Sequence, residues 1–270
     1  MGPHAFVIIK QRATQDIHKY TAAWGKSRNL YLTMSLNTSD ISKPGPPRVI
    51  SLGLGRTGTR SLAFALEKLG FGPFHKMGAL LRSKDPNQIK SWHNIGKGLA
   101  TTDDVHALLD SYTSVLEYPA VIYPEEIYKA YPDAKYILST RDPIKWEKSM
   151  KQTVLPALDI LRENKNRNPW QQALFEWFEE DMLNRYHEGL LNNEETIQQT
   201  ILVHNERIKK LIPAEKLLIY DISQGWDPLC KYLGVSKPDE PFPHENETAM
   251  FIERIFPTFM EQKEEYSCLW

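Results

Sequence analysis

The sequence predicts a three-layer α/β domain with a mainly parallel sheet of about four to five strands and a helical cap. Two observations support this fold class. Short apolar runs with β propensity alternate along the chain with longer segments of helical periodicity. The segments between successive runs are also long enough to form crossover connections, which favour parallel strand pairing. With 270 residues, the chain is long enough to bury a substantial core.

The first predicted strand, residues 49–52, is followed by a turn that contains Gly53, Gly55 and Gly58. Apolar residues then recur at helical spacing up to a glycine at position 70, where a helix C-cap is expected. A strand, a glycine-rich turn and a helix start direct backbone N–H groups toward one place. The sequence therefore predicts an anion-binding loop here.

The rest of the chain continues the alternation of strands and helices. We expect no strand between residues 72 and 84. Further strands are predicted at 115–117, 134–140 and 217–220. Helices are predicted within 77–109, with breaks near 85 and 97, and at 125–131, 143–154, 170–190, 194–212, 227–233 and 248–265.

Two domain-level predictions follow. Residues 48–270 are expected to form the folded domain, with cap segments at about 77–109 and 170–212. Residues 1–47 are expected to be a flexible extension and linker. A transit peptide is the alternative for the basic, acid-poor N-terminal part.

Composition excludes several classes of protein. A formal net charge of -1 argues against a nucleic-acid binder that works through bulk charge. No apolar run approaches the length of a transmembrane helix. The 2 cysteines cannot form a disulfide framework, which favours a reducing compartment and a cytoplasmic location. The histidines show no metal-ligand spacing, so no metal is expected.

Two common nucleotide loops fit the glycine-rich turn poorly. Residues 53–58 satisfy G-x-G-x-x-G, but an NAD site also requires an acid on a second strand about 20 residues further on. Residues 72–84 contain no acid. A triphosphate loop requires lysine and then a hydroxyl, where this chain has Thr59 and Arg60.

Residues 54–61, LGRTGTRS, resemble the 5′-phosphosulfate loop of sulfotransferases that use 3′-phosphoadenosine 5′-phosphosulfate (PAPS). The variant is similar to that of the small P-loop sulfotransferase family of fungi and flatworms. The resemblance continues through residues 136–150 and 217–244, and covers roughly 48–250. It implies a P-loop NTPase-like fold, with PAPS as donor, PAP as product, and a small-molecule alcohol or phenol as acceptor.

The resemblance also implies two anion sites. Arg56 is the expected cation for the phosphosulfate. Arg141 at a strand end, with Ser149 eight residues on, would bind the 3′-phosphate, for which a guanidinium offers a planar, permanently charged donor. The loop residues expected to bind the 5′-phosphosulfate are Gly55, Arg56, Thr57, Gly58, Thr59, Arg60 and Ser61.

An alcohol acceptor must lose a proton during attack, so a general base is expected near the sulfur. Glu117 stands where the resemblance implies an aspartate base. His75 is the second candidate, although Lys76 occupies the histidine position in a strict register. Tyr220 and Trp226 lie where related folds have an adenine wall.

Two other functions stay open from the residues alone. One is a nucleotide-binding module without catalysis, which the glutamate in place of aspartate and the position of Lys76 would favour. The other is an NAD-dependent oxidoreductase, which would bind its cofactor without regard to a 3′-phosphate.

Overall fold

The computed structural model describes residues 45–244, together with Phe251 and Phe259. These residues belong to one compact unit, Pro44–Trp270. Nearly all of the predicted N-terminal extension, and most of the predicted helix at 248–265, lie outside the described residues, so both stay predictions.

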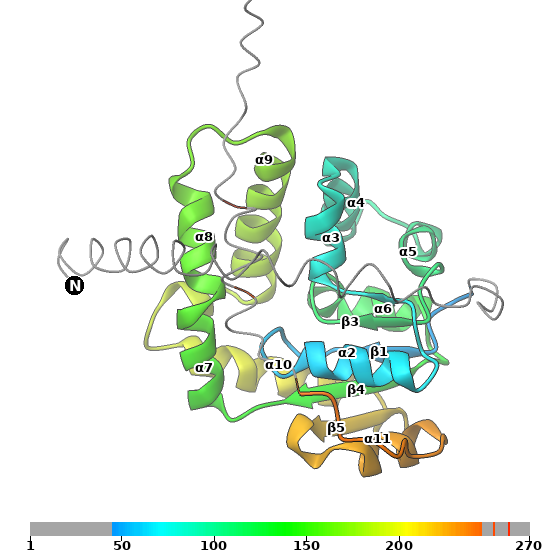
Figure 1. The fold of residues 1–270 in the computed structure, drawn as a ribbon. Coiled ribbons are helices and arrows are strands. Elements are labelled where there is room, and N and C mark those ends of the chain that lie inside the picture. Colours follow the sequence, from blue (N-terminus) through cyan, green and yellow to red (C-terminus); the bar gives the residue numbers. More distant parts are fainter. Residues whose placement is uncertain (1–44, 245–250, 252–258, 260–270) are drawn as a thin grey trace, which may run out of the picture. The chain divides into compact units, whose positions relative to one another are not determined.

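The described residues form a five-stranded parallel sheet (Figure 1). The spatial order is β2-β3-β1-β4-β5, and every neighbouring pair is parallel. The predicted fold class is confirmed. Because all strands run the same way, the residues that follow them gather at one edge of the sheet. The strands are β1 (Val49–Ser51), β2 (Phe74–His75), β3 (Ser114–Leu116), β4 (Lys135–Thr140) and β5 (Leu217–Asp221).

The expectation that residues 72–84 contain no strand is wrong. The two-residue strand β2 pairs with β3 at the edge of the sheet, with Phe74 opposite Ser114. Two residues are too few to show an alternating pattern in the sequence, so only the tertiary pairing identifies this strand.

Side chains alternate across the sheet and define two apolar layers. Val49 and Ile137 pack with α2 (Thr59–Lys68) and α11 (Trp226–Leu233) on one face. Ile50 and Leu138 point to the opposite face, in the cluster that includes α6 (Pro124–Ala130) and α10 (Ile197–Leu211). The strands β1 and β3 and the middle of β4 are therefore buried on both sides, as is usual in parallel sheets, whereas the edge strand β5 leaves Ile219 half exposed.

The helices expected within 77–109 are present, with breaks near the expected positions. They are α3 (Met77–Ser83), α4 (Pro86–Gly96) and α5 (Thr102–Leu109). Asp85 caps α4 by accepting a hydrogen bond from the Asn87 N–H, and Pro86 occupies the first helical position.

The helices after β4 differ in part from the prediction. Helix α7 (Pro143–Gln152) lies where a helix was expected at 143–154, whereas α8 (Val154–Glu163) is not among the predicted helices. The helix expected at 170–190 is α9 (Pro169–Glu176), continued by the π-helix η4 (Trp177–Tyr186). His93 of α4 contacts the buried Asp181 of η4 at 2.7 Å, which joins the two cap segments.

Short 3₁₀ turns complete the described part of the chain. They are η3 (Ala120–Ile122), η5 (Leu190–Asn192), η6 (Ala214–Lys216) and η7 (Ile222–Gln224). None of the helices among the described residues is long and apolar enough to cross a membrane.

Candidate active site

The glycine-rich loop connects the central strand β1 to α2 and lies tightly against β4. At Gly53, an added Cβ would lie 1.9 Å from Ser139 Oγ, so any side chain would collide with that strand. Gly58 is the N-cap of α2 with φ 84, a left-handed conformation that favours glycine. Within the described residues, no side chain caps this helix. Its first N–H groups therefore suit an anionic ligand.

Side chains from outside the loop hold its shape. The Thr57 hydroxyl donates to the Leu54 carbonyl at 2.7 Å and lies 2.6 Å from Ser139 Oγ. Because the Thr57 proton is directed to Leu54, Ser139 is the donor to Thr57. Trp146 of α7 donates its indole N–H to the Gly55 carbonyl at 2.9 Å. Hydrogen bonds from β4 and α7 therefore hold the loop in its conformation without a ligand.

Arg56 brings the two predicted anion positions together. Its Nε donates to Ser149 Oγ at 3.0 Å, and its carbonyl accepts from Arg141 Nη1 at 2.8 Å. Arg56 is 7% exposed, Ser149 is 4% exposed and Arg141 is half-buried. The side chain of Phe251 also lies against the guanidinium, with its ring centre 5.5 Å from Cζ. Residues about ninety positions apart in the chain thus form one cationic cluster beside the loop.

Glu117, the predicted base, lies on the other side of β1. It directly follows β3, and its side chain points at the start of α2, where Thr59 Oγ1 donates to Oε2 at 2.7 Å. Its other oxygen lies 3.4 Å from Lys76 Nζ. The carboxylate is buried, and both of its oxygens have a hydrogen-bonding or ionic partner.

Arg56 and Glu117 share an unusual backbone conformation. Their φ angles are 73° and 51°, in the left-handed region that non-glycine residues rarely adopt. Such conformations cost about 1–3 kcal/mol each and cluster at functional sites. The strain at Arg56 and Glu117 is an indication, independent of the sequence motifs, that both residues belong to a site.

His75, the second candidate base, is buried among aromatic rings. It lies between Trp92 and Tyr112, with ring centres 5.7 Å and 5.0 Å away. Burial lowers the pKa of His75 to about 4, so the imidazole is neutral at pH 7. Its buried Nδ1 has no hydrogen-bond partner in the described part of the chain. Lys76, which occupies the histidine position of the motif in a strict register, forms the ion pair with Glu117.

Tyr220 and Trp226 are core residues of the layer that contains α2 and α11. Tyr220 is fully buried and Trp226 is 4% exposed. The Tyr220 hydroxyl donates to the Gly225 carbonyl, and the Trp226 indole N–H donates to the Glu240 carbonyl. Both rings therefore pack within the apolar layer, and their role as an adenine wall stays a prediction.

The other loop residues lie at the start of α2. Thr59 and Ser61 are buried, and Arg60 is half-buried with its guanidinium 5.0 Å from the Phe64 ring centre.

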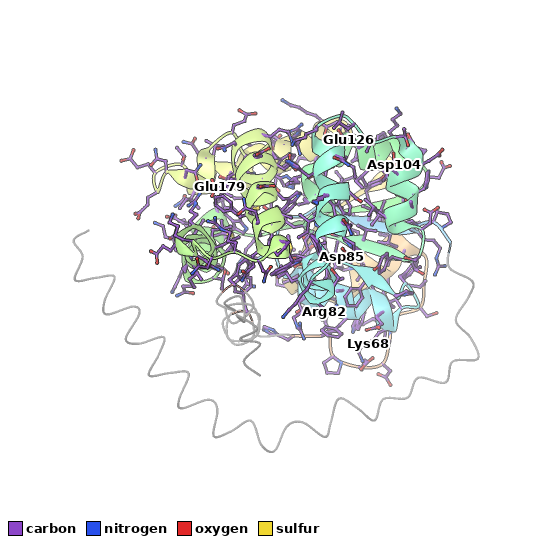
Figure 2. All side chains as sticks on the ribbon, turned by 90° about the horizontal axis from the view of Figure 1, so that it is seen from above. Lys68, Arg82, Asp85, Asp104, Glu126 and Glu179 are labelled. Carbon is purple, nitrogen blue, oxygen red and sulfur yellow. The ribbon has the colours of Figure 1, made fainter. Side chains whose placement is uncertain are left out.

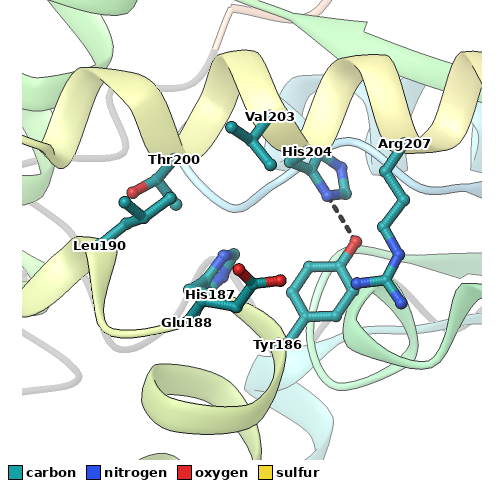
Figure 3. A pocket seen from close by; sticks show the side chains of 8 residues that line it. All are labelled: Tyr186, His187, Glu188, Leu190, Thr200, Val203, His204 and Arg207. Atoms are coloured by element: carbon teal, nitrogen blue, oxygen red, sulfur yellow. Dashed lines mark hydrogen bonds between the residues drawn. The ribbon is translucent and has the colours of Figure 1, made fainter.

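Tyr186 and His204 form a hydrogen bond at the wall of a pocket (Figure 3). His204 donates Nε2–H to the Leu52 carbonyl at 2.7 Å, so its Nδ1 accepts from the Tyr186 hydroxyl. Burial lowers the pKa of His204 to about 4, which keeps it neutral. His187 bonds to the hydroxyl of Tyr118, the neighbour of Glu117, at 2.9 Å. Tyr186, His187 and His204 line a cavity of about 270 Å³, which contains none of the predicted site residues.

Several of these supporting residues were missed by sequence reasoning. Ser139, Trp146 and His204 act across large sequence separations, and so does Lys76 in its contact with Glu117. The motif drew attention to the position of Lys76, but no local signal identifies any of these contacts. The described residues contain no group of three or more His, Cys, Asp or Glu that could hold a metal ion.

Comparison with known proteins identifies the class. A family model described as a sulfotransferase domain matches residues 48–251. The chain belongs to this sulfotransferase family, as the loop motif predicted. It is also similar to Ava biosynthesis cluster protein M of Aspergillus versicolor, at 29% identity over 211 residues, which cover 73% of this chain and 80% of the relative's length. Membership of the family supports a transferase that moves sulfuryl groups.

Proposed function

We propose that the chain transfers a sulfuryl group from PAPS to the hydroxyl of a small-molecule alcohol or phenol. The observation that carries this proposal is the convergence of Arg56, Arg141 and Ser149 on one side of the loop, with Glu117 on the other. Cations for two phosphates and a base for an alcohol are the groups that this reaction needs.

The residues fit a nucleotide with phosphates at both the 5′ and 3′ positions. The start of α2 has no side-chain cap in the described chain, which suits the 5′-phosphosulfate. Arg141 and Ser149 would hold the 3′-phosphate, and Arg56 lies between the two positions. ATP and NAD carry no 3′-phosphate, so this second position favours PAPS over both.

When bound, PAPS supplies an activated sulfuryl group on its 5′-phosphate. Arg56 and the N–H groups of residues 57–60 orient that group and stabilise negative charge on the phosphate. Glu117 accepts the proton of the acceptor hydroxyl as the hydroxyl oxygen approaches sulfur. Thr59 holds Glu117 in position by donating to Oε2. The acceptor would lie between the carboxyl edge of the sheet and the cap helices.

Two measurements test the proposal. Thermal-shift titrations with PAP, ATP and NAD should show stabilisation by PAP at the lowest concentration. A panel of phenols with labelled PAPS should then give sulfated product with the wild-type chain.

The variant Glu117→Gln should lower product formation by about 10²–10⁴-fold, because an amide cannot accept the proton. Its PAP affinity should not fall below that of the wild-type chain. A nucleotide-binding module without catalysis would bind PAP and give no product with any phenol. A preference for NAD would contradict the proposal outright.

A further inference from the structure

Lys76 places an ammonium group beside the loop, although the loop itself contains no lysine. Thr59 stands where a triphosphate-binding loop has lysine. Lys76 directly follows β2, and Glu117 directly follows the neighbouring strand β3. Parallel pairing therefore delivers both side chains to the same edge of the sheet, where Nζ and Oε1 are 3.4 Å apart.

This ion pair is poorly exposed to solvent. The side chains of Lys76 and Glu117 are only 15% and 11% exposed. Charges in such an environment are weakly screened and interact more strongly than surface pairs. A single carboxylate separates the ammonium from Thr59, the first residue of α2. The ammonium therefore lies next to the place where a bound phosphosulfate would sit.

We propose that Lys76 is a second cation, in addition to Arg56, that stabilises the leaving phosphate, and that Glu117 holds it in place until the proton is transferred. This inference rests on the proposed function. In the step, the acceptor oxygen forms a bond to sulfur while the bond from sulfur to the bridging oxygen breaks. The electron pair of the broken bond stays on that oxygen, and the acceptor proton goes to Glu117.

The charges of the pair explain why this arrangement assists the reaction. Before the step, Glu117 is an anion and attracts Lys76. Once Glu117 has taken the proton, it is neutral and its attraction for the ammonium falls. Negative charge develops on the bridging oxygen at the same time, so Lys76 gains a new anionic partner as it loses the old one. Interactions that strengthen only along the reaction path increase the rate.

The test uses two ligands that need no acceptor. PAP carries the 5′-phosphate produced by the reaction, and adenosine 3′-phosphate lacks it. Calorimetric titration of Lys76→Met should show PAP affinity lowered by about tenfold or more, since a charge-assisted hydrogen bond to phosphate is lost. Affinity for adenosine 3′-phosphate should stay within about twofold of the wild-type value.

A double-mutant cycle separates this role from a structural one. Glu117→Gln should raise PAP affinity, because Lys76 is then released to the phosphate. The gain should disappear when Glu117→Gln is combined with Lys76→Met. If Lys76 only supports Glu117, the gain will persist in the double mutant, or PAP affinity will not respond to Lys76→Met, and the proposal fails.

Turnover gives a second readout with matched controls. Lys76→Met should lower kcat while leaving the KM for the phenol unchanged, and Lys76→Arg should recover part of kcat. Lys68→Met is the control, since Lys68 lies on α2 (Figure 2) and forms an exposed ion pair with Glu240 at 2.8 Å. Lys68→Met should change neither kcat nor the KM for the phenol. If the wild-type chain does not bind PAP, the proposed function itself is refuted. If the wild-type chain binds PAP and Lys76→Met binds it equally well, only this inference is refuted.

Discussion

Removal of Arg141 should weaken binding of PAP far more than binding of a ligand without the 3′-phosphate. Arg141 is half-buried and donates to the Arg56 carbonyl at 2.8 Å, beside Ser149. A hydrogen bond to a charged partner contributes about 1.5–3 kcal/mol, which corresponds to roughly 10–150-fold in affinity. Arg141→Ala should therefore weaken PAP by at least about tenfold. Ser149→Ala removes a neutral donor that contributes about 0.5–1.5 kcal/mol, so it should lower PAP affinity less than Arg141→Ala does.

The assay is calorimetric titration with PAP and with adenosine 5′-phosphate, which lacks the 3′ group. Binding of adenosine 5′-phosphate should change little, because Arg141→Ala removes only the bond to the loop carbonyl. Lys148→Ala serves as a control, since Lys148 is an exposed neighbour of Ser149. If Arg141→Ala weakens both ligands equally, its effect comes through loop geometry, and the assignment of the 3′-phosphate to Arg141 is refuted.

Two further predictions concern stability. Gly53→Ala should destabilise the fold by about 1–3 kcal/mol in urea unfolding, because the new Cβ would lie 1.9 Å from Ser139 Oγ; an unchanged midpoint would show that β4 can move aside. Stability should also fall as pH decreases from about 6.5 to about 4, because burial holds the pKa of both His75 and His204 at about 4 while the unfolded chain takes up protons near 6.5. Each histidine should contribute up to about 1.4 kcal/mol per pH unit in that window, and His204→Asn should flatten the measured dependence. A slope identical to that of the wild-type chain would contradict a neutral His204.

Much of the fold was predictable because its signals are local. The apolar run before Gly53, the β-prone run before Arg141 and the proline at the start of α4 each reflect the conformational preferences of neighbouring residues. Strand β2 and the π-helix η4 were not predicted. A two-residue strand is stabilised by its pairing with β3, and η4 forms where Asp181 packs against α4, so both depend on contacts with distant residues.

Part of the candidate site was also predictable from local sequence, and part depends on contacts between distant residues. Loop residues such as Arg56 were identifiable because glycine spacing and a helix start are encoded in consecutive positions. The sequence could suggest Glu117 as a base, but not that Lys76 and Thr59 hold its two oxygens. It also suggested Tyr220 for an adenine wall but could not show that this ring is fully buried beside α2 and α11.

By itself, the sequence determined that a glycine-rich loop follows a buried strand and that an arginine ends a later one. Only the tertiary structure decided what these parts contact. The order β2-β3-β1-β4-β5 places Arg141 on one side of the loop, and Glu117 with Lys76 on the other. The physical reason is that parallel pairing aligns the carboxyl ends of the strands at one edge. Which side chains meet there depends on the order of the strands, and no local stretch of sequence encodes that order.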